Sequence, residues 1–290
     1  MESFESLRNY LFAIAYRMLG SVMEAEDMVQ EAWLRWDRKD RSAVQNPKPF
    51  LAKTITRLCL DRLKSAQAKR EQYVGEWLPE PIMTQRSADL NNWAEPDKTV
   101  ELAESLSFAF LHMLERLTPA ERAVFLLREV FDYDYPAIAE IVDRKEAACR
   151  QLLRRAKTSV AADRPKFDTT PAEHEQILAS FATAVVSGSM EGLLAILADD
   201  VVEYSDGGGL RKAALKPILG ADRVARFLLG IMKQAPPNTV PTFSHLNGRP
   251  AIVVEIDGEP YTTIQLYIED GKIKRIFSQL NPEKIAHLMG

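Results

Sequence analysis

Residues 135–157, YPAIAEIVDRKEAACRQLLRRAK, decide how the middle of this chain folds. The small residue Ala139, a turn four residues later at Asp143 and the apolar Cys149 six residues beyond have the spacing of a helix-turn-helix. Asp143 stands where glycine is usual, and aspartate adopts a left-handed backbone at modest cost. Residues 118–121, TPAE, start the preceding helix with an N-cap, a proline at N1 and a glutamate at N3. The second helix of the motif is predicted to bury Ala148, Cys149, Leu152, Leu153 and Ala156.

The opposite face of that second helix is basic. In helix-turn-helix proteins the second helix enters the major groove of DNA. Arginine pairs bidentately with guanine and glutamine with adenine, and each good pair gives about 1–3 kcal/mol of discrimination. We predict contacts with bases for Arg150, Gln151, Arg154 and Arg155, and contacts with phosphates for Lys145 and Lys157. The alternative is a solvated basic helix with no nucleic-acid role.

Positive charge is concentrated in two stretches of a chain whose formal net charge is −4. Residues 53–70 hold six basic residues against one acidic residue, and residues 144–166 hold eight against two. Phosphate neutralisation needs a local basic surface rather than a basic average. The two stretches therefore predict two separate contacts with nucleic acid.

Length and composition favour a protein with two or three compact domains, since the chain has 290 residues of which 46% are hydrophobic. The first residues lack the pattern of a signal peptide, and no apolar run approaches the roughly 18 residues that span a bilayer. Cys59 and Cys149 have no CxxC or Cys/His neighbours, so they are expected to be buried thiols. We expect a soluble cytoplasmic protein with no membrane partner, metal or cofactor.

Residues 1–72 predict three amphipathic helices. The first covers residues 3–19, and a capping box of Ser21 and Glu24 opens the second. The prolines in residues 46–49 predict a break, with the third helix running from about Phe50 to Lys69. The second helix is expected to bury Ala25, Met28, Val29, Ala32, Trp33 and Trp36. Its exposed acidic face consists of Glu24, Asp27, Gln30 and Glu31. This face is either simply solvated or a docking face for a basic partner.

Residues 25–36, AEDMVQEAWLRW, and residues 48–71, KPFLAKTITRLCLDRLKSAQAKRE, resemble regions 2.1 to 2.4 of an extracytoplasmic-function (ECF) sigma factor of the sigma-70 type. The resemblance implies that Asp27, Gln30 and Glu31 bind the clamp helices of the β′ subunit of core RNA polymerase. It implies contacts with the −10 promoter element for Lys53, Arg57, Arg62, Lys64, Lys69 and Arg70. Asp61 would orient a neighbouring arginine, and residues 39–49 would form one wall of a pocket for a flipped base.

Residues 104–163 are similar to sigma region 4, which contacts the −35 element and the β flap of the polymerase. The linker before it, residues 73–103, lacks a helical period and includes GEWLPEP at residues 75–81, which resembles the WLPEP motif of ECF factors with a fused C-terminal extension. Exposed aromatic and apolar side chains on a linker are costly unless they are docked. We predict a docked, regulatory strap formed by Trp77, Leu78, Pro79, Glu80 and Pro81.

After a short linker at residues 164–172, residues 173–290 predict helices followed by a curled antiparallel sheet. Strands are expected at residues 201–205, 239–246, 251–256, 261–268 and 272–280, with hairpin turns at Asp257-Gly258 and Asp270-Gly271. Residues 181–209 resemble the SnoaL branch of the NTF2-like superfamily, whose α+β cones enclose a pocket. The fold class is thus a mainly α N-terminal half plus an NTF2-like cone.

Asp206, Gly207, Gly208 and Gly209 are assigned an interdomain, regulatory role, although close backbone approach at these glycines suits a ligand as well as a turn docked on another domain. In the extension-bearing subgroup this motif reads DGGGKV, whereas residues 206–211 here are DGGGLR, so the lysine is lost; residues 281–285, NPEKI, correspond to its NPDKL motif. Tyr204, Asp206 and His245 would supply acid–base groups if they converged inside the cone.

These features together predict an alternative sigma factor, not an enzyme, that binds core RNA polymerase and promoter DNA. The C-terminal cone would regulate it in cis by docking on the strap and on both helical modules. Two alternatives remain open at this point. One is a one-component DNA-binding regulator whose cone senses a small ligand, and the other is a pocket enzyme tethered to DNA-binding modules.

Overall fold

A computed structural model describes residues 4–39, 44–70, 72–84, 104–161 and 163–289 of the chain. It divides into two compact units. The first holds the described residues up to 72, together with 104–106 and 110–164, and the second holds residues 73–84, 107–109 and those from 165 onward. Each unit is described by itself below. Within the described residues, no helix is both long and apolar enough to cross a membrane.

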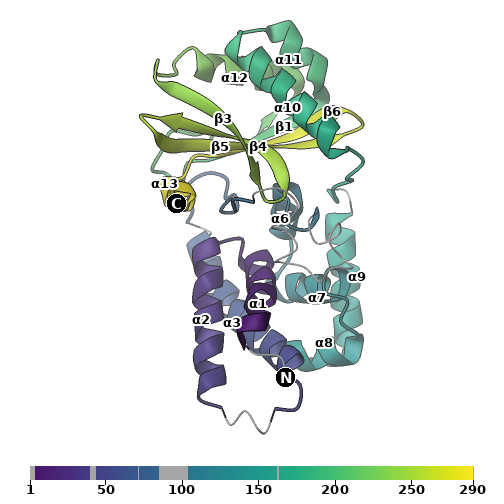
Figure 1. Cartoon of the computed structure of the whole chain (residues 1–290). Coiled ribbons are helices and arrows are strands. Elements are labelled where there is room, and N and C mark those ends of the chain that lie inside the picture. The colour runs from purple at the N-terminus through teal and green to yellow at the C-terminus, as the bar shows by residue number, and fades with distance from the viewer. Residues whose placement is uncertain (1–3, 40–43, 71, 85–103, 162, 290) are drawn as a thin grey trace. The chain divides into compact units, whose positions relative to one another are not determined.

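Three helices begin the first unit: α1 (Phe4–Leu19), α2 (Val22–Asp37) and α3 (Pro47–Arg70), which pack side by side (Figure 1). Gly20 ends α1 with a φ of 70°, and the Ser21 hydroxyl accepts a hydrogen bond from the Glu24 amide at the start of α2, as predicted. A break precedes the third helix as predicted, but α3 starts at Pro47, three residues before the expected start at about Phe50. Both prolines lie in the first turn of α3, where backbone N–H groups have no intrahelical acceptor and proline costs little.

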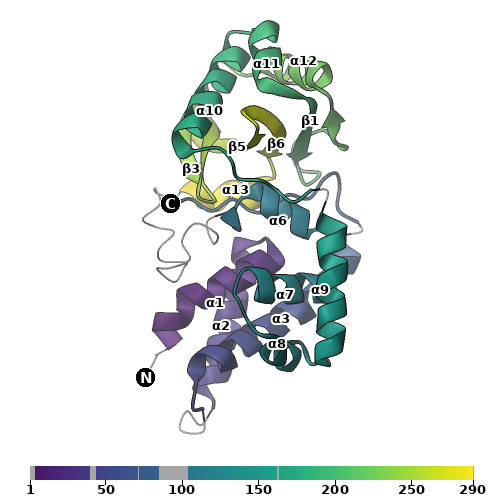
Figure 2. The same cartoon turned by 90° about the vertical axis from the view of Figure 1, so that its right-hand side faces the viewer.

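The helix-turn-helix is confirmed, and it follows two shorter elements, α6 (Phe108–Leu114) and α7 (Pro119–Glu129). Thr118 and Glu121 form the expected capping box of α7. Helix α8 (Tyr135–Val142) ends at Asp143, whose φ of 55° and ψ of 57° are left-handed, and α9 (Glu146–Val160) follows (Figure 2). Cys149, Leu152, Leu153 and Ala156 are buried, so α9 packs by its predicted face.

The second unit is an α+β cone. Helices α10 (Pro171–Val186), α11 (Met190–Ile196) and α12 (Ala221–Met232) pack on one face of a six-stranded sheet, as Figures 1 and 2 show. The strands are β1 (Leu197–Asp206), β2 (Ile218–Leu219), β3 (Thr239–Leu246), β4 (Arg249–Ile256), β5 (Glu259–Glu269) and β6 (Lys272–Gln279). They are followed by α13 (Pro282–Ile285) and a 3₁₀ turn (Ala286–Met289).

The sheet order is β2-β1-β6-β5-β4-β3. The expected hairpins at Asp257-Gly258 and Asp270-Gly271 are confirmed by positive φ angles at all four residues, and Asn247-Gly248 forms a third turn of this type. The expectation of a fully antiparallel sheet is wrong, because β1 and β6 pair in parallel. These strands are far apart in the sequence, so no tight turn sets their direction. The fold class, a helical N-terminal half plus an α+β cone, is confirmed.

Each face of the cone's sheet has its own cluster of apolar side chains. Leu178, Phe181, Val224 and Leu228 of the helices pack against strand residues such as Ile276 on one face. On the other face Tyr267 and Phe277 pack with three residues from outside the sheet: Leu78 of the linker, and Phe108 and Ala109 at the start of α6. The sheet therefore contacts the helical layer on one face and parts of the linker and of α6 on the other.

A carboxyl group is buried inside the cone. Glu203 on β1 has no exposed surface, the Ser205 hydroxyl donates to its Oε1 at 3.0 Å, and its Oε2 has no hydrogen-bond partner among the described residues. Burial raises the pKa of Glu203 from 4.5 to about 8, and hydrogen bonds from Ser278 and Ser205 oppose that shift only in part. At neutral pH the folded cone therefore holds a protonated Glu203.

We expect Glu203→Gln to stabilise the cone increasingly as pH rises from about 5 to 8. The unfolded carboxyl ionises above its ordinary pKa of 4.5, whereas the folded one keeps its proton up to about 8. Ionisation thus favours the unfolded state across this window, by on the order of 3 kcal/mol at pH 7. Hydrogen exchange of β1 amides at several pH values measures the difference. Exposed Glu259→Gln is the control, and a pH-independent gain in Glu203→Gln would contradict the prediction.

Candidate functional site

One stripe of α2 is exposed within the first unit. Met23, Asp27, Gln30 and Leu34 recur at helical spacing, and the two apolar side chains are 65% and 41% exposed. Trp33, which was expected in the buried stripe, is instead 40% exposed beside it. Glu31 is half-buried and pairs with Arg35 at 2.9 Å. One face of α2 thus presents two exposed apolar side chains beside an acidic and a polar one.

Two of the basic residues expected to face DNA contact α8 instead. The Lys53 ammonium lies 2.8 Å from the Glu140 carboxylate. The Arg57 guanidinium donates to the backbone carbonyls of Ile141 at 2.9 Å and Glu140 at 3.0 Å. These carbonyls belong to the last turn of α8, where helices leave acceptors unused. The amphipathic pattern of α3 correctly predicts that Lys53 and Arg57 point away from the core of the three-helix bundle. It does not predict that they contact α8.

The other basic residues of α3 differ in their surroundings. Arg62 donates to the Glu24 carboxylate at 2.6 and 3.0 Å, so this pair joins α3 to α2. Lys64 is exposed and pairs with Asp61 at 3.3 Å, so the contact of Asp61 recorded here is with a lysine rather than the expected arginine. The side chains of Lys69 and Arg70 lie outside the described residues, as do positions 40–43 of the proposed base pocket.

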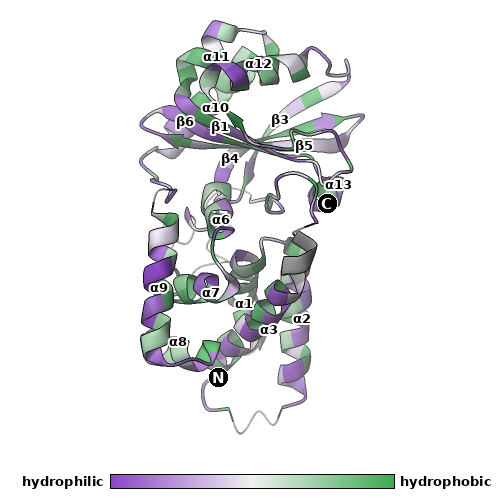
Figure 3. Cartoon of the chain, turned by 180° about the vertical axis from the view of Figure 1, so that it is seen from behind, coloured by the Kyte–Doolittle hydropathy of each residue, from purple (hydrophilic) through white to green (hydrophobic). Residues whose placement is uncertain are grey.

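The outer face of α9 is exposed as predicted, and the helix alternates hydrophilic and hydrophobic residues along its length (Figure 3). Arg150 lies 4.2 Å over the Tyr135 ring and 3.1 Å from Glu146. Arg155 and Lys157 are held toward α7 by Glu121 at 3.3 Å and Glu129 at 2.9 Å. Gln151 and Arg154 have no side-chain partner in the part of the chain that the structure describes, and Lys145 is exposed at the N-cap of α9.

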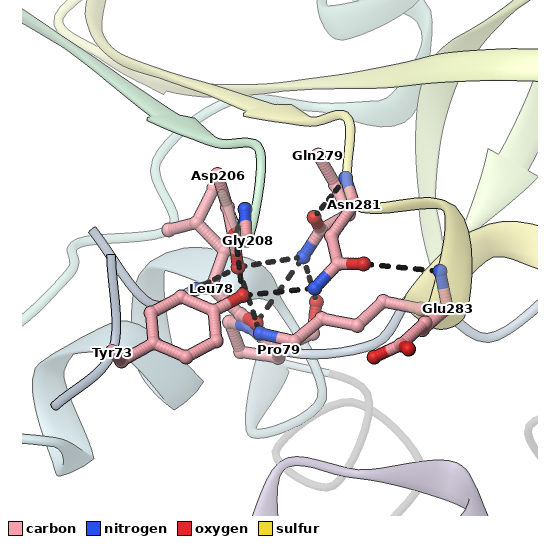
Figure 4. Close-up of polar contacts among 9 residues, drawn as sticks. Tyr73, Leu78, Pro79, Asp206, Gly208, Gln279, Asn281 and Glu283 are labelled. Carbon is pink, nitrogen blue, oxygen red and sulfur yellow. Dashed lines mark hydrogen bonds and ion pairs between the residues drawn. The ribbon is translucent and has the colours of Figure 1, made fainter. Parts of the chain in front are cut away.

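In the second unit, Asp206 is the centre of a buried polar network at the end of β1 (Figure 4). Its Oδ1 accepts hydrogen bonds from the Tyr73 hydroxyl at 2.6 Å and the Gly208 amide at 3.0 Å. Its Oδ2 accepts from the Leu78 amide at 2.8 Å and the Lys284 ammonium at 2.7 Å. The Gln279 amide also donates to Oδ2, at 3.3 Å. Burial and the Asp206 charge raise the pKa of Tyr73.

The predicted strap, residues 77–81, is docked on the sheet together with its flanking residues, and the whole segment 73–84 is called the strap from here on. Lys284 donates to the Leu78 carbonyl at 2.7 Å and lies 4.2 Å over the Trp77 ring. The Gln279 amide donates to the Leu78 and Pro79 carbonyls, and His287 lies 2.7 Å from the Pro81 carbonyl. Leu78 and Glu80 are buried. Further along, the Ile82 amide donates to the Asn247 side chain at 3.0 Å, and the Thr84 amide donates to the His245 carbonyl at 2.9 Å.

Glycine is required at the positions after Asp206 because neighbouring atoms lie where a Cβ would be. A Cβ on Gly208 would lie 2.3 Å from the Asn281 side-chain nitrogen, and a Cβ on Gly207 would lie 2.2 Å from the Arg211 carbonyl. Gly209, with a φ of 74°, lies against Val74 of the strap. The cation that bridges Asp206 to the strap is Lys284 of the NPEKI segment, while Arg211 donates to the backbone carbonyl of Tyr261. The NPEKI segment is visible in the sequence, but no local pattern in it predicts this role of Lys284.

The three residues considered for acid–base chemistry lie in different surroundings. Tyr204 stacks on Phe277 with ring centroids 5.6 Å apart. Asp206 is occupied by the strap network, and His245 lies 3.9 Å from Glu175. Cys59 and Cys149 are buried free thiols, and no cluster of potential metal ligands is found among the described residues. Of the three side chains, Asp206 is the one that takes part in docking the strap.

Comparison with known proteins agrees with both units. A model of sigma-70 region 2 matches residues 4–69, and a model of sigma-70 region 4 matches residues 107–160. The ECF RNA polymerase sigma factor SigJ of Mycobacterium tuberculosis is 35% identical over 99% of this chain and 93% of its own length. Probable sigma factor SigI of the same organism is 33% identical over 97% of this chain and 93% of its length.

The crystal structure of M. tuberculosis SigJ resembles the whole fold, with a TM-score of 0.78 and 32% identity, and it covers 98% of this chain and 97% of that one. The relationship therefore includes the C-terminal cone as well as the helical modules. On this evidence the chain belongs to the ECF class of sigma-70 RNA polymerase sigma factors, alternative sigma factors that direct the initiation of transcription.

Proposed function

We propose that this sigma factor holds core RNA polymerase through the exposed stripe of α2 and recognises two promoter elements, −10 through α3 and −35 through α9. The exposed stripe is the observation that supports the polymerase contact: Met23, Asp27, Gln30 and Leu34 share one face of α2. On α9, Gln151 and Arg154 extend from the exposed face without side-chain partners among the described residues, so they are suited to reach base edges. Arg155 and Lys157, paired with α7, are suited to phosphate contacts.

The contact between α3 and α8 belongs to a DNA-free state. The −10 and −35 elements are centred roughly 25 base pairs apart, which is about 85 Å at 3.4 Å per base pair. Helix α3 touches α8 of the helix-turn-helix through Arg57 at 2.9 Å. A factor with its modules in contact cannot occupy both elements, so promoter binding requires that Lys53 and Arg57 leave α8. Their protein acceptors then give way to DNA phosphates.

The cone regulates this separation in cis through the connection between the modules. That connection runs from the end of α3 to the start of α6, and residues from both of its ends, 73–84 and 107–109, belong to the cone's unit. Residues docked on the cone cannot span the distance between the two helical modules. Docking therefore shortens the distance that the rest of the connection can bridge, since a chain extends by at most about 3.3–3.6 Å per residue. Release of the strap makes its residues available again for this span. The buried Asp206–Lys284 network is what sets the docked state.

Asp27→Arg tests the polymerase contact. The substitution reverses a charge in the middle of the exposed stripe and places a bulky cation against a basic partner surface, so we expect loss of most binding to core RNA polymerase. Pull-down of the polymerase and promoter-dependent transcription in vitro measure the effect, with Glu259→Arg on the cone as a control that should behave as the parent. Equal binding by Asp27→Arg and the parent would exclude this face of α2.

Glu140→Lys tests the closed arrangement. It places a like charge beside Lys53 and Arg57 on an exposed side chain, so repulsion should favour separation of α3 from α8. Fluorescence energy transfer between dyes on α2 and α9 should report a longer distance in the free variant, close to that of the parent bound to polymerase and promoter. Glu146→Lys, on the exposed first turn of α9, is the control. No difference between parent free and bound states would contradict the proposal.

Lys284→Met tests regulation through the strap. Removing the cation leaves Asp206 as an unpaired buried charge, which costs about 3–5 kcal/mol and should expose the amides of residues 78–84 to hydrogen exchange. Lys274→Met breaks the exposed pair with Asp200 and should cost less than about 1 kcal/mol. Transcription should change in Lys284→Met alone. A strap released without any change in transcription would refute regulation in cis, and a strap still protected would refute the role of the network.

A further inference from the structure

Arg211 joins three segments of the cone close to where the strap docks. It follows the glycines after Asp206, and its Nη1 atom lies within hydrogen-bonding distance of three backbone carbonyls. Two of these carbonyls, those of Pro260 and Tyr261, lie near the start of β5, and the third, that of Leu280, follows β6. The guanidinium also lies 4.6 Å over the Tyr261 ring. One side chain thus ties the turn after β1 to the ends of two other strands.

The backbone of Leu280 is held on both sides by the segment around the turn after β1. Its amide donates to the Asp206 backbone carbonyl at 2.7 Å, and its own carbonyl accepts from Arg211 at 3.4 Å. The two neighbours of Leu280 are Gln279 and Asn281, both of which belong to the polar network at the strap (Figure 4). Peptide groups are planar, so fixing the N–H and the carbonyl of Leu280 restricts the backbone torsions that aim these two side chains.

The side chains of Gln279 and Asn281 donate directly to the strap. The Gln279 amide donates to the Leu78 carbonyl at 3.2 Å and to the Pro79 carbonyl at 3.0 Å. The Asn281 amide donates to the Tyr73 hydroxyl at 2.9 Å. Hydrogen bonds weaken steeply as their angles depart from linearity, so rotation of either side chain lowers the stability of the docked state. The strength of docking therefore depends on how the backbone of this segment is held.

Residue 211 is also a position where this chain differs from the sequence motif that it resembles. The motif of the extension-bearing subgroup is DGGGKV, so a valine stands where this chain has Arg211. Valine has no donor for the three carbonyls. Arg211 is half-buried, so water can reach these carbonyls when the side chain loses its donors, and the cone itself should lose little stability. Water does not replace the fixed direction of the contact.

We propose that Arg211 is a positioning residue for docking of the strap: it holds the Leu280 carbonyl and so aims the side chains on either side of that residue at the strap. In the described part of the chain, the side-chain hydrogen bonds of Arg211 go to carbonyls of the cone outside the strap. Arg211 therefore acts through its neighbours. Its effect on transcription rests on the proposed regulation in cis, whereas its effect on docking does not.

Arg211→Met in the full chain tests this role, because methionine keeps an apolar stem but has no donor for the carbonyls. Hydrogen exchange at the amides of residues 78–84 should become about fivefold faster, the value of about one hydrogen bond. Amides in the middle of β4 should exchange as in the parent. Arg211→Lys, which keeps a cation with three donors, should restore part of the protection. Arg226→Met, which breaks an exposed pair with Asp222 on α12, is the control and should leave the strap unchanged.

A double-mutant cycle separates positioning from a general loss of stability. Tyr73→Phe removes the hydroxyl that accepts from Asn281, so Arg211→Met should accelerate strap exchange less in that background than in the parent. Additive effects, an unchanged strap in Arg211→Met, or equal acceleration in β4 and in the strap would each overturn the positioning role. Lys284→Met, measured alongside, separates the two proposals. If both variants release the strap without changing transcription, regulation in cis fails and the positioning role stands.

Discussion

The ion pair between Lys284 and Asp206 is the contact on which the docked strap depends. Both charges are buried, and each alone would be strongly destabilising in that position. They are tolerated because the carboxylate accepts hydrogen bonds from Tyr73, Leu78 and Gly208 as well. These donors come from the strap and from the turn after β1, while the cation follows β6. An apolar cluster would accept the strap in many registers, whereas a carboxylate with directional donors accepts one.

A comparable use of charge holds the helical modules in contact. Lys53 and Arg57 have the chemistry to bind phosphates, yet protein oxygens occupy them here, a carboxylate in one case and helix carbonyls in the other. The carbonyls at the end of α8 carry partial negative charge and so substitute for part of the DNA backbone. In the proposed promoter complex, the same side chains would exchange these protein acceptors for DNA phosphates.

Features that depend only on neighbouring residues within one element could be predicted from the sequence. The capping box at Thr118, the left-handed Asp143 and the Asp257-Gly258 turn each depend on a few neighbouring residues, and all are present. The Asn247-Gly248 turn and helix α12 carry local signals of the same kind, and neither is among the predicted elements.

The wrong expectations involve partners that are distant in the sequence. The parallel pairing of β1 with β6 joins the two ends of the cone, and no local pattern sets its direction. Amphipathic spacing shows which residues point away from the core of their own bundle. It does not show whether such a residue, for example Arg57, contacts water or the carbonyls of α8. It also grouped Trp33 with the core, although the ring lies at the border of the buried face. The role of Lys284 depends on a strap about two hundred residues earlier, so its own neighbours in the sequence do not predict it.

The long sequence separation between the strap and Lys284 also has a consequence during synthesis of the protein. Leu78 and Lys284 are separated by 206 positions, so the ribosome completes both helical modules well before the lysine that fixes the strap emerges. At about 5–20 residues per second, synthesis from Val160 at the end of α9 to Lys284 takes roughly 6–25 seconds. Every nascent copy thus passes through a period in which both helical modules exist without the contact that docks the strap. The speed of translation over the cone then sets the length of that period.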